Sequence, residues 1–231
     1  MKYLAAFLSA LLLSGCNTTS NHRPADYQVK TSTPQAISSL FSSDAPVMSD
    51  EDIERALAHK VAFSKVNRIA IVNLTNKGNS SKSDLVQINS DILVHFIGKL
   101  TGSHRVYDAS FMPTLLLPEQ KTVPFLREAA ARYQADLILV YKNSCDNFKQ
   151  WNVFEKDRAR ASCNTEAVLI DTRTGIVPFT ITSTKKYTAN RSDNELSFHE
   201  TIKNAEVKAI NDGLGEVATK LRAFIEATPT L

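Results

Sequence analysis

Two of the three cysteines are spaced so that their thiols can form a disulfide bond. Cys145 and Cys163 lie at equal sequence distances from Phe154, at the loop ends of two predicted neighbouring strands. Such positions face each other across an antiparallel hairpin, and an oxidising compartment would allow the bond. Closing a loop of this length would stabilise the fold by about 3 kcal/mol. Free thiols are the alternative, and the sequence has no C-x-x-C spacing that would indicate redox chemistry or zinc.

Histidines and carboxylates show no spacing typical of a metal or catalytic site. No histidine stands at a metal-ligand spacing from another, and His95 borders the apolar stripe of a predicted helix. The sequence has no G-x-S-x-G elbow, phosphate-binding glycine loop or H-E-x-x-H motif. Asp171 begins a predicted turn, where an aspartate normally bonds its own backbone. We therefore expect no enzymatic activity, metal or cofactor, and we expect His95 at the edge of the core.

The N-terminus has the pattern of an export signal that ends in a lipid-acceptor cysteine. Lys2 precedes an apolar stretch from Leu4 to Leu13, which is too short to span a bilayer comfortably as a helix. Leu13-Ser14-Gly15-Cys16 resembles the bacterial lipobox at every position. This resemblance implies cleavage before Cys16 and acylation of its thiol and its new amino group. An ordinary secretory signal or an N-terminal core helix is the alternative.

The predicted organisation is a signal peptide over residues 1–15, a lipidated linker over 16–47 and a folded domain over 48–231. Asn17 stands where an aspartate would favour inner-membrane retention, so the resemblance implies an outer-membrane lipoprotein. We expect it to face the periplasm, with exposure at the cell surface as the alternative. Three acyl chains would hold it there, because a single chain binds only marginally. The linker is rich in Ser, Thr, Asn, Pro and Gln, which is typical of a flexible tether. Alternatively, its residues Ile37, Leu40 and Phe41 dock on the domain.

Composition and charge indicate an ordinary globular domain that does not bind nucleic acid. Hydrophobic residues make up 43% of the chain and charged residues 22%. The formal net charge is +3, and no run of Lys and Arg is longer than a pair. A nucleic-acid-binding protein needs a concentrated basic surface to displace counterions.

Hydrophobic periodicity predicts an α/β fold with a five-stranded mixed sheet covered by helices. A capping box at Ser49–Asp52 begins a short helix with an apolar face of Ile53, Leu57 and Val61. Residues 146–158 carry six charged side chains and are predicted to form a solvated loop. Strands are predicted over residues 68–74, 105–108, 136–141, 159–170 and 176–187, and further helices over 84–100, 122–134 and from Ser192 to about Leu221. This β-α-β-α-β-β-β-α order implies a mixed sheet in a single domain.

Three stretches together resemble a known family. They are the strand at 68–74, the helix-to-strand passage at 125–139, and the hairpin Ala167-Val168-Leu169-Ile170-Asp171-Thr172-Arg173-Thr174-Gly175. They are similar to the TolB amino-terminal domain and the related CsgG-like family of periplasmic α/β domains, with Gln134 where the family usually has a glycine. The resemblance covers about residues 65–225 and implies non-enzymatic contact with other envelope components. Residues 146–158 are too charged for the membrane hairpins of the family's channel members, so no pore is expected.

Aromatic side chains within the charged segment are the candidate contacts with a partner. Phe148, Trp151 and Phe154 stand among charged residues, and tryptophan is enriched in interface anchors. Alternatively, these rings fold back onto the sheet. The similarly apolar segment 111–118 either covers a sheet edge or contacts a partner.

The functional prediction is an anchored, non-enzymatic lipoprotein that binds or assembles another envelope component. Anchoring raises the effective concentration of the domain near membrane partners, so a weak interface would suffice. The alternative is a lipoprotein that activates a periplasmic enzyme such as a peptidoglycan synthase, and an unrecognised hydrolase is a more distant alternative. The sequence predicts neither the identity of the partner nor the oligomeric state.

Overall fold

The computed structural model describes residues 39–41, 48–74, 84–150, 158–192, 195 and 197–231, with the backbone alone at 84–90 and 150. The predicted signal peptide, Cys16 and most of the predicted linker lie outside the described residues. All described residues belong to one structural unit. Within it, no described helix is long and apolar enough to cross a membrane.

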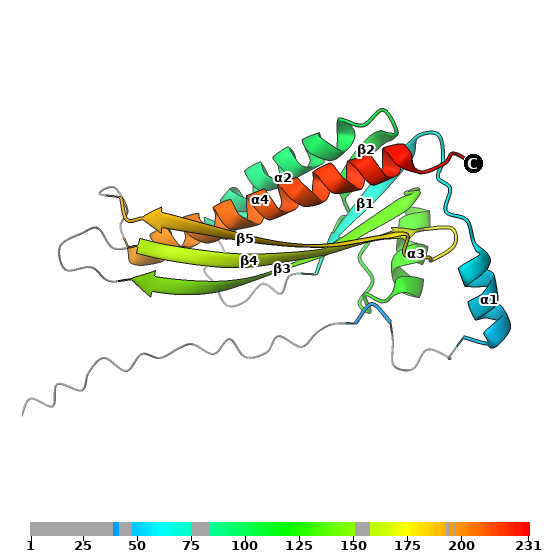
Figure 1. Ribbon diagram of the computed structural model, residues 1–231, viewed down its shortest axis with the longest axis horizontal. Coiled ribbons are helices and arrows are strands. Elements are labelled where there is room, and N and C mark those ends of the chain that lie inside the picture. Colours follow the sequence, from blue (N-terminus) through cyan, green and yellow to red (C-terminus); the bar gives the residue numbers. More distant parts are fainter. Residues whose placement is uncertain (1–38, 42–47, 75–83, 151–157, 193–194, 196) are drawn as a thin grey trace, which may run out of the picture. The chain divides into compact units, whose positions relative to one another are not determined.

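The described residues form a five-stranded mixed sheet and four helices, as the sequence predicts (Figure 1). The elements are, in chain order, α1 (Asp50–Ala58), β1 (Asn67–Asn73), α2 (Asp84–Thr101), β2 (Val106–Phe111), α3 (Val123–Arg132), β3 (Leu137–Gln150), β4 (Arg158–Asp171), β5 (Phe179–Asn190) and α4 (Phe198–Ala227). The strand order in the sheet is β2-β1-β3-β4-β5. Strand β1 pairs in parallel with both β2 and β3, whereas β3, β4 and β5 form an antiparallel meander.

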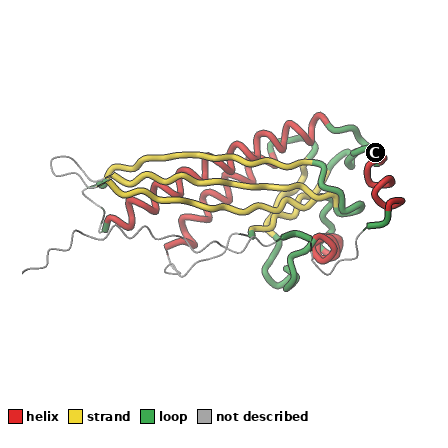
Figure 2. The backbone as a smooth tube through the Cα atoms, turned by 60° about the horizontal axis from the view of Figure 1, so that its bottom comes forward, coloured by secondary structure: helices red, strands yellow, loops and turns green. Residues whose placement is uncertain are grey.

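The strands differ in length, and this divides the sheet into two parts. Strand β1 ends at Asn73, opposite Tyr141 of β3, but β3 continues to Gln150. We call the three-stranded extension formed by residues 142–150, 158–166 and 182–190 the ribbon, and the remainder the five-stranded part. Figure 2 shows the three long strands running past the ends of the two short ones.

The five-stranded part is covered by helices on both faces. Apolar side chains of α2 and α4 pack on one face, around Phe96, Leu139 and Leu169. Helix α3 packs on the other face through Val123 and Leu126. Because side chains of a strand alternate between faces, residues 137, 139 and 141 contact the α2–α4 layer, whereas 138 and 140 contact α3.

In the part of the chain that the structure describes, the ribbon is covered on one face only, by the first half of α4. Small buried side chains let the helix lie close to the strands, and they come from Ala161, Cys163, Ala205 and Ala209. A β-carbon added at Gly213 would stand 2.7 Å from the hydroxyl oxygen of Thr165. The backbone of α4 therefore lies directly against the Thr165 side chain at the base of the ribbon.

The prediction of a solvated loop over residues 146–158 is wrong at both ends. Residues 146–150 continue β3, and Arg158 begins β4; residues 151–157 lie outside the described part. The charges mislead because the ribbon has a face open to water. Antiparallel strands tolerate polar side chains on such a face, so Asp146 is compatible with strand structure.

Other predicted boundaries also move. Strand β2 runs from Val106 to Phe111 instead of 105–108, and β5 begins at Phe179, directly after Pro178, which lacks the backbone N–H that strand pairing needs. Helix α4 begins after Ser197 and not at Ser192, and it continues past Leu221 to Ala227.

The carboxylate of Glu195 holds the segment before α4 in place. It accepts hydrogen bonds from the backbone N–H of Ser192 (3.2 Å), from the amide of Asn204 (2.9 Å) and from the hydroxyl of Thr201. Ser197, at the N-cap position, makes no side-chain cap bond. Glu195 therefore connects the first turns of α4 to the preceding chain.

Helix α1 has the predicted cap, but its apolar face is not buried. The Ser49 hydroxyl oxygen accepts a hydrogen bond from the backbone N–H of Asp52 at 3.2 Å. However, the helix ends at Ala58, and no residue of α1 is buried, so Ile53 and Leu57 are exposed. The cap and the acidic first turn stabilise the helix locally, which does not require an apolar face against the sheet.

Leu40, within the predicted linker, is docked on the domain. The carbonyl oxygen of Leu40 accepts a hydrogen bond from the backbone N–H of Val123 at 2.7 Å. The Leu40 side chain packs against the apolar cluster between α3 and the sheet, whereas Phe41 is exposed. The docking alternative therefore holds for Leu40; Ile37 lies outside the described residues.

Candidate functional site

The disulfide that the sequence predicts lies in the middle of the ribbon. Cys145 and Cys163 are directly opposite each other in the β3–β4 register, and their sulfur atoms are 2.07 Å apart. Cys163 is buried against α4 beside Ala205 and Ala209. No described helix covers the other face of these two strands. The disulfide fixes their register, and a register shift of one residue would move every side chain to the opposite face.

The face of the ribbon opposite α4 carries polar side chains in three aligned rows. No described helix covers it, and we call it the open face. Its residues are Lys142, Ser144, Asp146 and Phe148 on β3, Arg158, Arg160, Ser162, Asn164 and Glu166 on β4, and Thr182, Thr184, Lys186, Thr188 and Asn190 on β5. Cross-strand bonds order part of this face, since the Thr184 hydroxyl donates to the Asn164 amide oxygen at 3.0 Å.

The aromatic side chain on the open face is held by its cross-strand neighbour. Phe148 pairs with Arg160 in the β3–β4 register, and the guanidinium carbon lies 5.2 Å from the ring centroid. Phe148 is nevertheless 50% exposed. A cation–π contact of this kind stabilises by about 0.5–1 kcal/mol at an exposed site. It orients an apolar ring and a planar cation side by side, where both are accessible to a partner.

The three residues predicted to contact a partner have different outcomes. The structure places Phe148 on the open face and does not fold it back onto the sheet. Trp151 and Phe154 lie outside the described residues. Arg160, the neighbour of Phe148, is not singled out by the sequence prediction, but strand pairing about the predicted disulfide would have revealed it.

A groove between α2 and α4 brings several charged side chains close together. It encloses about 500 Å³ and is lined by His95, Lys99, Lys208, Asn211, Asp212, Gly215, Glu216, Thr219 and Lys220. His95 is exposed there, so its predicted place at the core edge is wrong. Ile92 and Phe96 face the core, and His95 lies to one side of this buried stripe, in the groove between α2 and α4.

Glu216 is the most strongly perturbed carboxylate of this groove. Its oxygens accept hydrogen bonds from the ammonium groups of Lys185 and Lys220, both at 2.7 Å, and from the Ser183 hydroxyl at 2.8 Å. The bonds from Lys185, Lys220 and Ser183 lower the pKa of Glu216 to about 2. A carboxylate that stays ionised near neutral pH serves poorly as a general acid or base. We therefore assign Glu216 a structural role, in which its hydrogen bonds connect β5 to α4.

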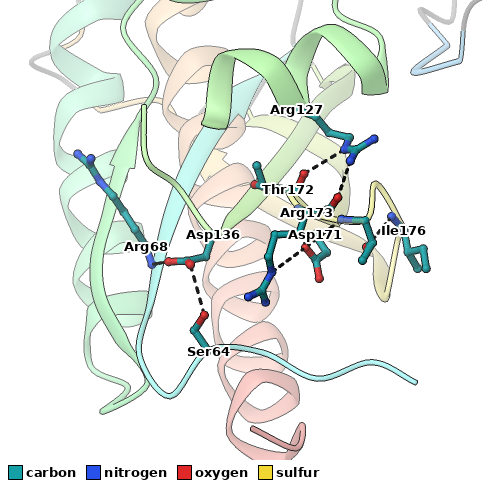
Figure 3. A network of polar contacts seen from close by, with 9 residues as sticks. Ser64, Arg68, Arg127, Asp136, Asp171, Thr172, Arg173 and Ile176 are labelled. Carbon is teal, nitrogen blue, oxygen red and sulfur yellow. Dashed lines mark hydrogen bonds and ion pairs between the residues drawn. The ribbon is translucent and has the colours of Figure 1, made fainter. Parts of the chain in front are cut away.

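Two further carboxylates accept hydrogen bonds from backbone N–H groups at the other end of the sheet (Figure 3). Asp171 accepts from the N–H of Arg173 at 2.8 Å, as predicted for a turn, and Gly175 has the positive φ of 76° that the turn needs. Asp136 accepts from the N–H of Arg68 at 2.9 Å. Figure 3 also shows Arg127 donating to the carbonyl oxygens of the hairpin, at 3.0 Å for Thr172.

A metal site finds no support in the described residues. In that part of the chain, no three His, Cys, Asp or Glu side chains come close enough to hold an ion. The carboxylates of Asp171, Asp136, Glu195 and Glu216 are each engaged in hydrogen bonds with the backbone or with side chains.

No protein-family model matches this chain, and no curated protein matches it in sequence. Solved bacterial structures are similar in fold. A homolog of the neuraminyllactose-binding hemagglutinin from Helicobacter pylori has 10% identity and a TM-score of 0.46, over 80% of this chain and 96% of that one. Protein CT253 from Chlamydia trachomatis has 9% identity and a TM-score of 0.43, over 71% and 99%. Lipoprotein GNA1162 from Neisseria meningitidis has 11% identity and a TM-score of 0.32, over 70% and 99%. At these values, none carries an argument about function.

Proposed function

We propose that this chain is an outer-membrane lipoprotein, anchored through Cys16 in the periplasm, whose domain binds another envelope component without catalysing a reaction. The open face of the ribbon is the observation that supports the proposal most directly. It combines a half-exposed Phe148, the guanidinium group of Arg160 and rows of hydroxyl and amide side chains. Aromatic rings and arginines are the side chains that most often anchor protein interfaces.

The position of the open face also favours a binding role. The ribbon extends β3 by nine residues past the last pairing with β1, from Lys142 to Gln150. At about 3.3 Å per residue, this is an extension of about 30 Å. The apolar core of the five-stranded part does not require it, because that core is closed by α2, α3 and α4. Strands that extend beyond the core provide surface for contact.

The family assignment is part of the proposal. The TolB amino-terminal-domain and CsgG-like resemblance gains support from two local features. Gln134, which stands where the family has glycine, adopts a positive φ of 55°, a conformation that glycine adopts most readily. The hairpin Asp171–Gly175 has the turn geometry that its family motif requires. In this family, the shared property would be contact with envelope proteins or polymers.

Site-specific photocrosslinking in intact cells tests the binding role. A photoreactive phenylalanine analogue at position 148 should give a defined adduct with an envelope component. The matched control is the same analogue at Tyr107, an exposed aromatic residue on β2; it should give no such adduct. Equal crosslinking at both positions, or none at either, would contradict the open face as the interface.

A second experiment separates simple binding from enzyme regulation. The purified folded protein is added to a peptidoglycan synthase, and glycan polymerisation is measured with and without it. We expect no stimulation. Stimulation that disappears with Phe148→Ala would instead support the regulator alternative and would leave the location of the interface unchanged.

A further inference from the structure

Four large apolar side chains are exposed around the point where the chain enters the described unit. They are Phe41 (65% exposed), Leu115 (96%), Leu116 (44%) and Phe125 (45%), and we call them the entry patch. The hydrogen bond from Val123 to Leu40 fixes Phe41 beside the start of α3. Leu40, Leu117 and Val123 all contact the apolar cluster under α3. Each of the four exposed side chains therefore lies within two residues in sequence of a residue that packs in this cluster.

The entry patch is not needed to close the core beneath it. Leu126 and Ala130 of α3 already fill the space on that face of the sheet. Two turn bonds, from Leu116 N–H to the Pro113 carbonyl (2.9 Å) and from Leu117 N–H to the Thr114 carbonyl (3.3 Å), fix the backbone of this connection. In this ordered connection Leu117 packs against the cluster and Leu115 points into solvent.

The position of the patch along the chain indicates what covers it. The chain between Cys16 and Leu40 spans at most about 80 Å, at about 3.5 Å per extended residue. Because Leu40 is bonded to α3, the tether from Cys16 joins the domain on this side, next to the entry patch, and brings the patch within reach of the bilayer. Exposed leucine and phenylalanine side chains gain free energy when they enter the lipid–water boundary. The anchor would make even a small patch effective by raising its concentration at the surface.

We infer that the entry patch rests on the lipid surface to which the chain is anchored, and so fixes the orientation of the domain. This inference depends on the proposed function, because it requires acylation at Cys16. The face covered by α2 would then point away from the bilayer, because α2 and α3 lie on opposite faces of the sheet. Val94 of α2, which is 70% exposed, therefore provides a matched control position.

Depth-dependent fluorescence quenching tests the inference on the full acylated chain. The chain has a single tryptophan, so Trp151→Phe gives a silent background for either Phe125→Trp or Val94→Trp. The proteins are reconstituted in vesicles of phosphatidylethanolamine and phosphatidylglycerol (3:1), with and without brominated acyl chains. Brominated lipid should quench the Phe125→Trp reporter at least twofold and leave the Val94→Trp reporter unchanged.

The outcomes separate the orientation from the anchor. Adding Leu115→Ser and Leu116→Ser should bring the quenching of the Phe125→Trp reporter close to the control value, while the protein still sediments with vesicles and keeps its helical circular dichroism. Sedimentation with equal quenching of both reporters would overturn the inference and leave the anchor intact; the patch would then be open to a protein partner or a second copy. Failure of the acylated chain to sediment would overturn the proposed anchoring itself.

Discussion

In the five-stranded part, β3 and β4 bury side chains on both faces, whereas in the ribbon the same strands bury only the side chains that face α4. The buried residues change accordingly, from Leu139 and Leu169 to Ala161 and Cys163. The ribbon replaces large apolar side chains with close helix contact and a covalent bond. The comparison shows that the length of β3 and β4 depends on strand pairing and on packing against α4. It does not depend on an apolar core on both faces. It also predicts that the two parts respond differently to substitution.

The largest expected effect is in the five-stranded part. Leu139→Ala removes a fully buried side chain from the cluster under α2 and α4. Such a substitution costs about 2–5 kcal/mol, so the free energy of unfolding in urea should fall by that amount. Phe148→Ala, on the open face, should change it by less than about 1 kcal/mol. Equal losses would show that the ribbon is part of one uniform core.

Removing the disulfide should loosen the ribbon selectively. Cys145→Ser combined with Cys163→Ser eliminates a loop closure of 18 residues, which corresponds to about 3 kcal/mol in the chain-entropy model. Hydrogen exchange should accelerate at amides of residues 142–150 and 158–166. Amides of β1 should keep their protection, since β1 does not pair with the ribbon. Accelerated exchange throughout the sheet would contradict the division into two parts.

A pair of glycine substitutions tests how closely α4 contacts the sheet. Gly213→Ala would place a β-carbon 2.7 Å from the Thr165 hydroxyl oxygen, and such overpacking costs about 1–3 kcal/mol. Gly98→Ala on α2 is the control, because nothing lies within 4 Å of the added carbon. It should stabilise the protein by up to about 1 kcal/mol through helix propensity. Thermal unfolding of both variants measures the contrast, and a stabilising Gly213→Ala would be incompatible with direct contact.

The smallest expected effect is the pH dependence of the bonds between β5 and α4. The pKa of Glu216 is lowered to about 2 in the folded protein, so its stabilising contribution is complete above the usual carboxyl pKa. It is lost as the pH falls from about 4.5 towards 2. Glu216→Gln should therefore lower the free energy of unfolding at pH 6, by less than about 1 kcal/mol for partly exposed pairs. The difference from the wild type should vanish near pH 2.

Local features of the fold could be predicted from the sequence because their causes are local. The cap at Ser49, the turn at Asp171 and the positive φ of Gly175 each depend on neighbouring residues. The pairing of Cys145 with Cys163 also follows, because the midpoint of a hairpin fixes its register. The order of strands and helices follows from the period of the apolar residues.

Features that depend on distant residues could not be predicted. Predicting that residues 146–150 form a strand requires knowing that α4 covers one face of the ribbon. Glu216 and Lys220 are four residues apart, but Lys185 and Ser183 reach Glu216 only because β5 lies beside α4. The docking of Leu40 on Val123 joins residues far apart in the chain. For the candidate site, Phe148 was predicted and its partner Arg160 was not.

Helix α3 and the open face lie on the same side of the sheet. The side chains at 138 and 140 contact α3, and those at 142, 144, 146 and 148 follow in the same alternation along β3. A helix layer is about 10 Å thick. A domain that rests on lipid through the start of α3 would hold the ribbon above the bilayer with a clearance of that order. Such a gap admits one helix, one extended chain or a single polymer strand lying flat, and it excludes a second globular domain.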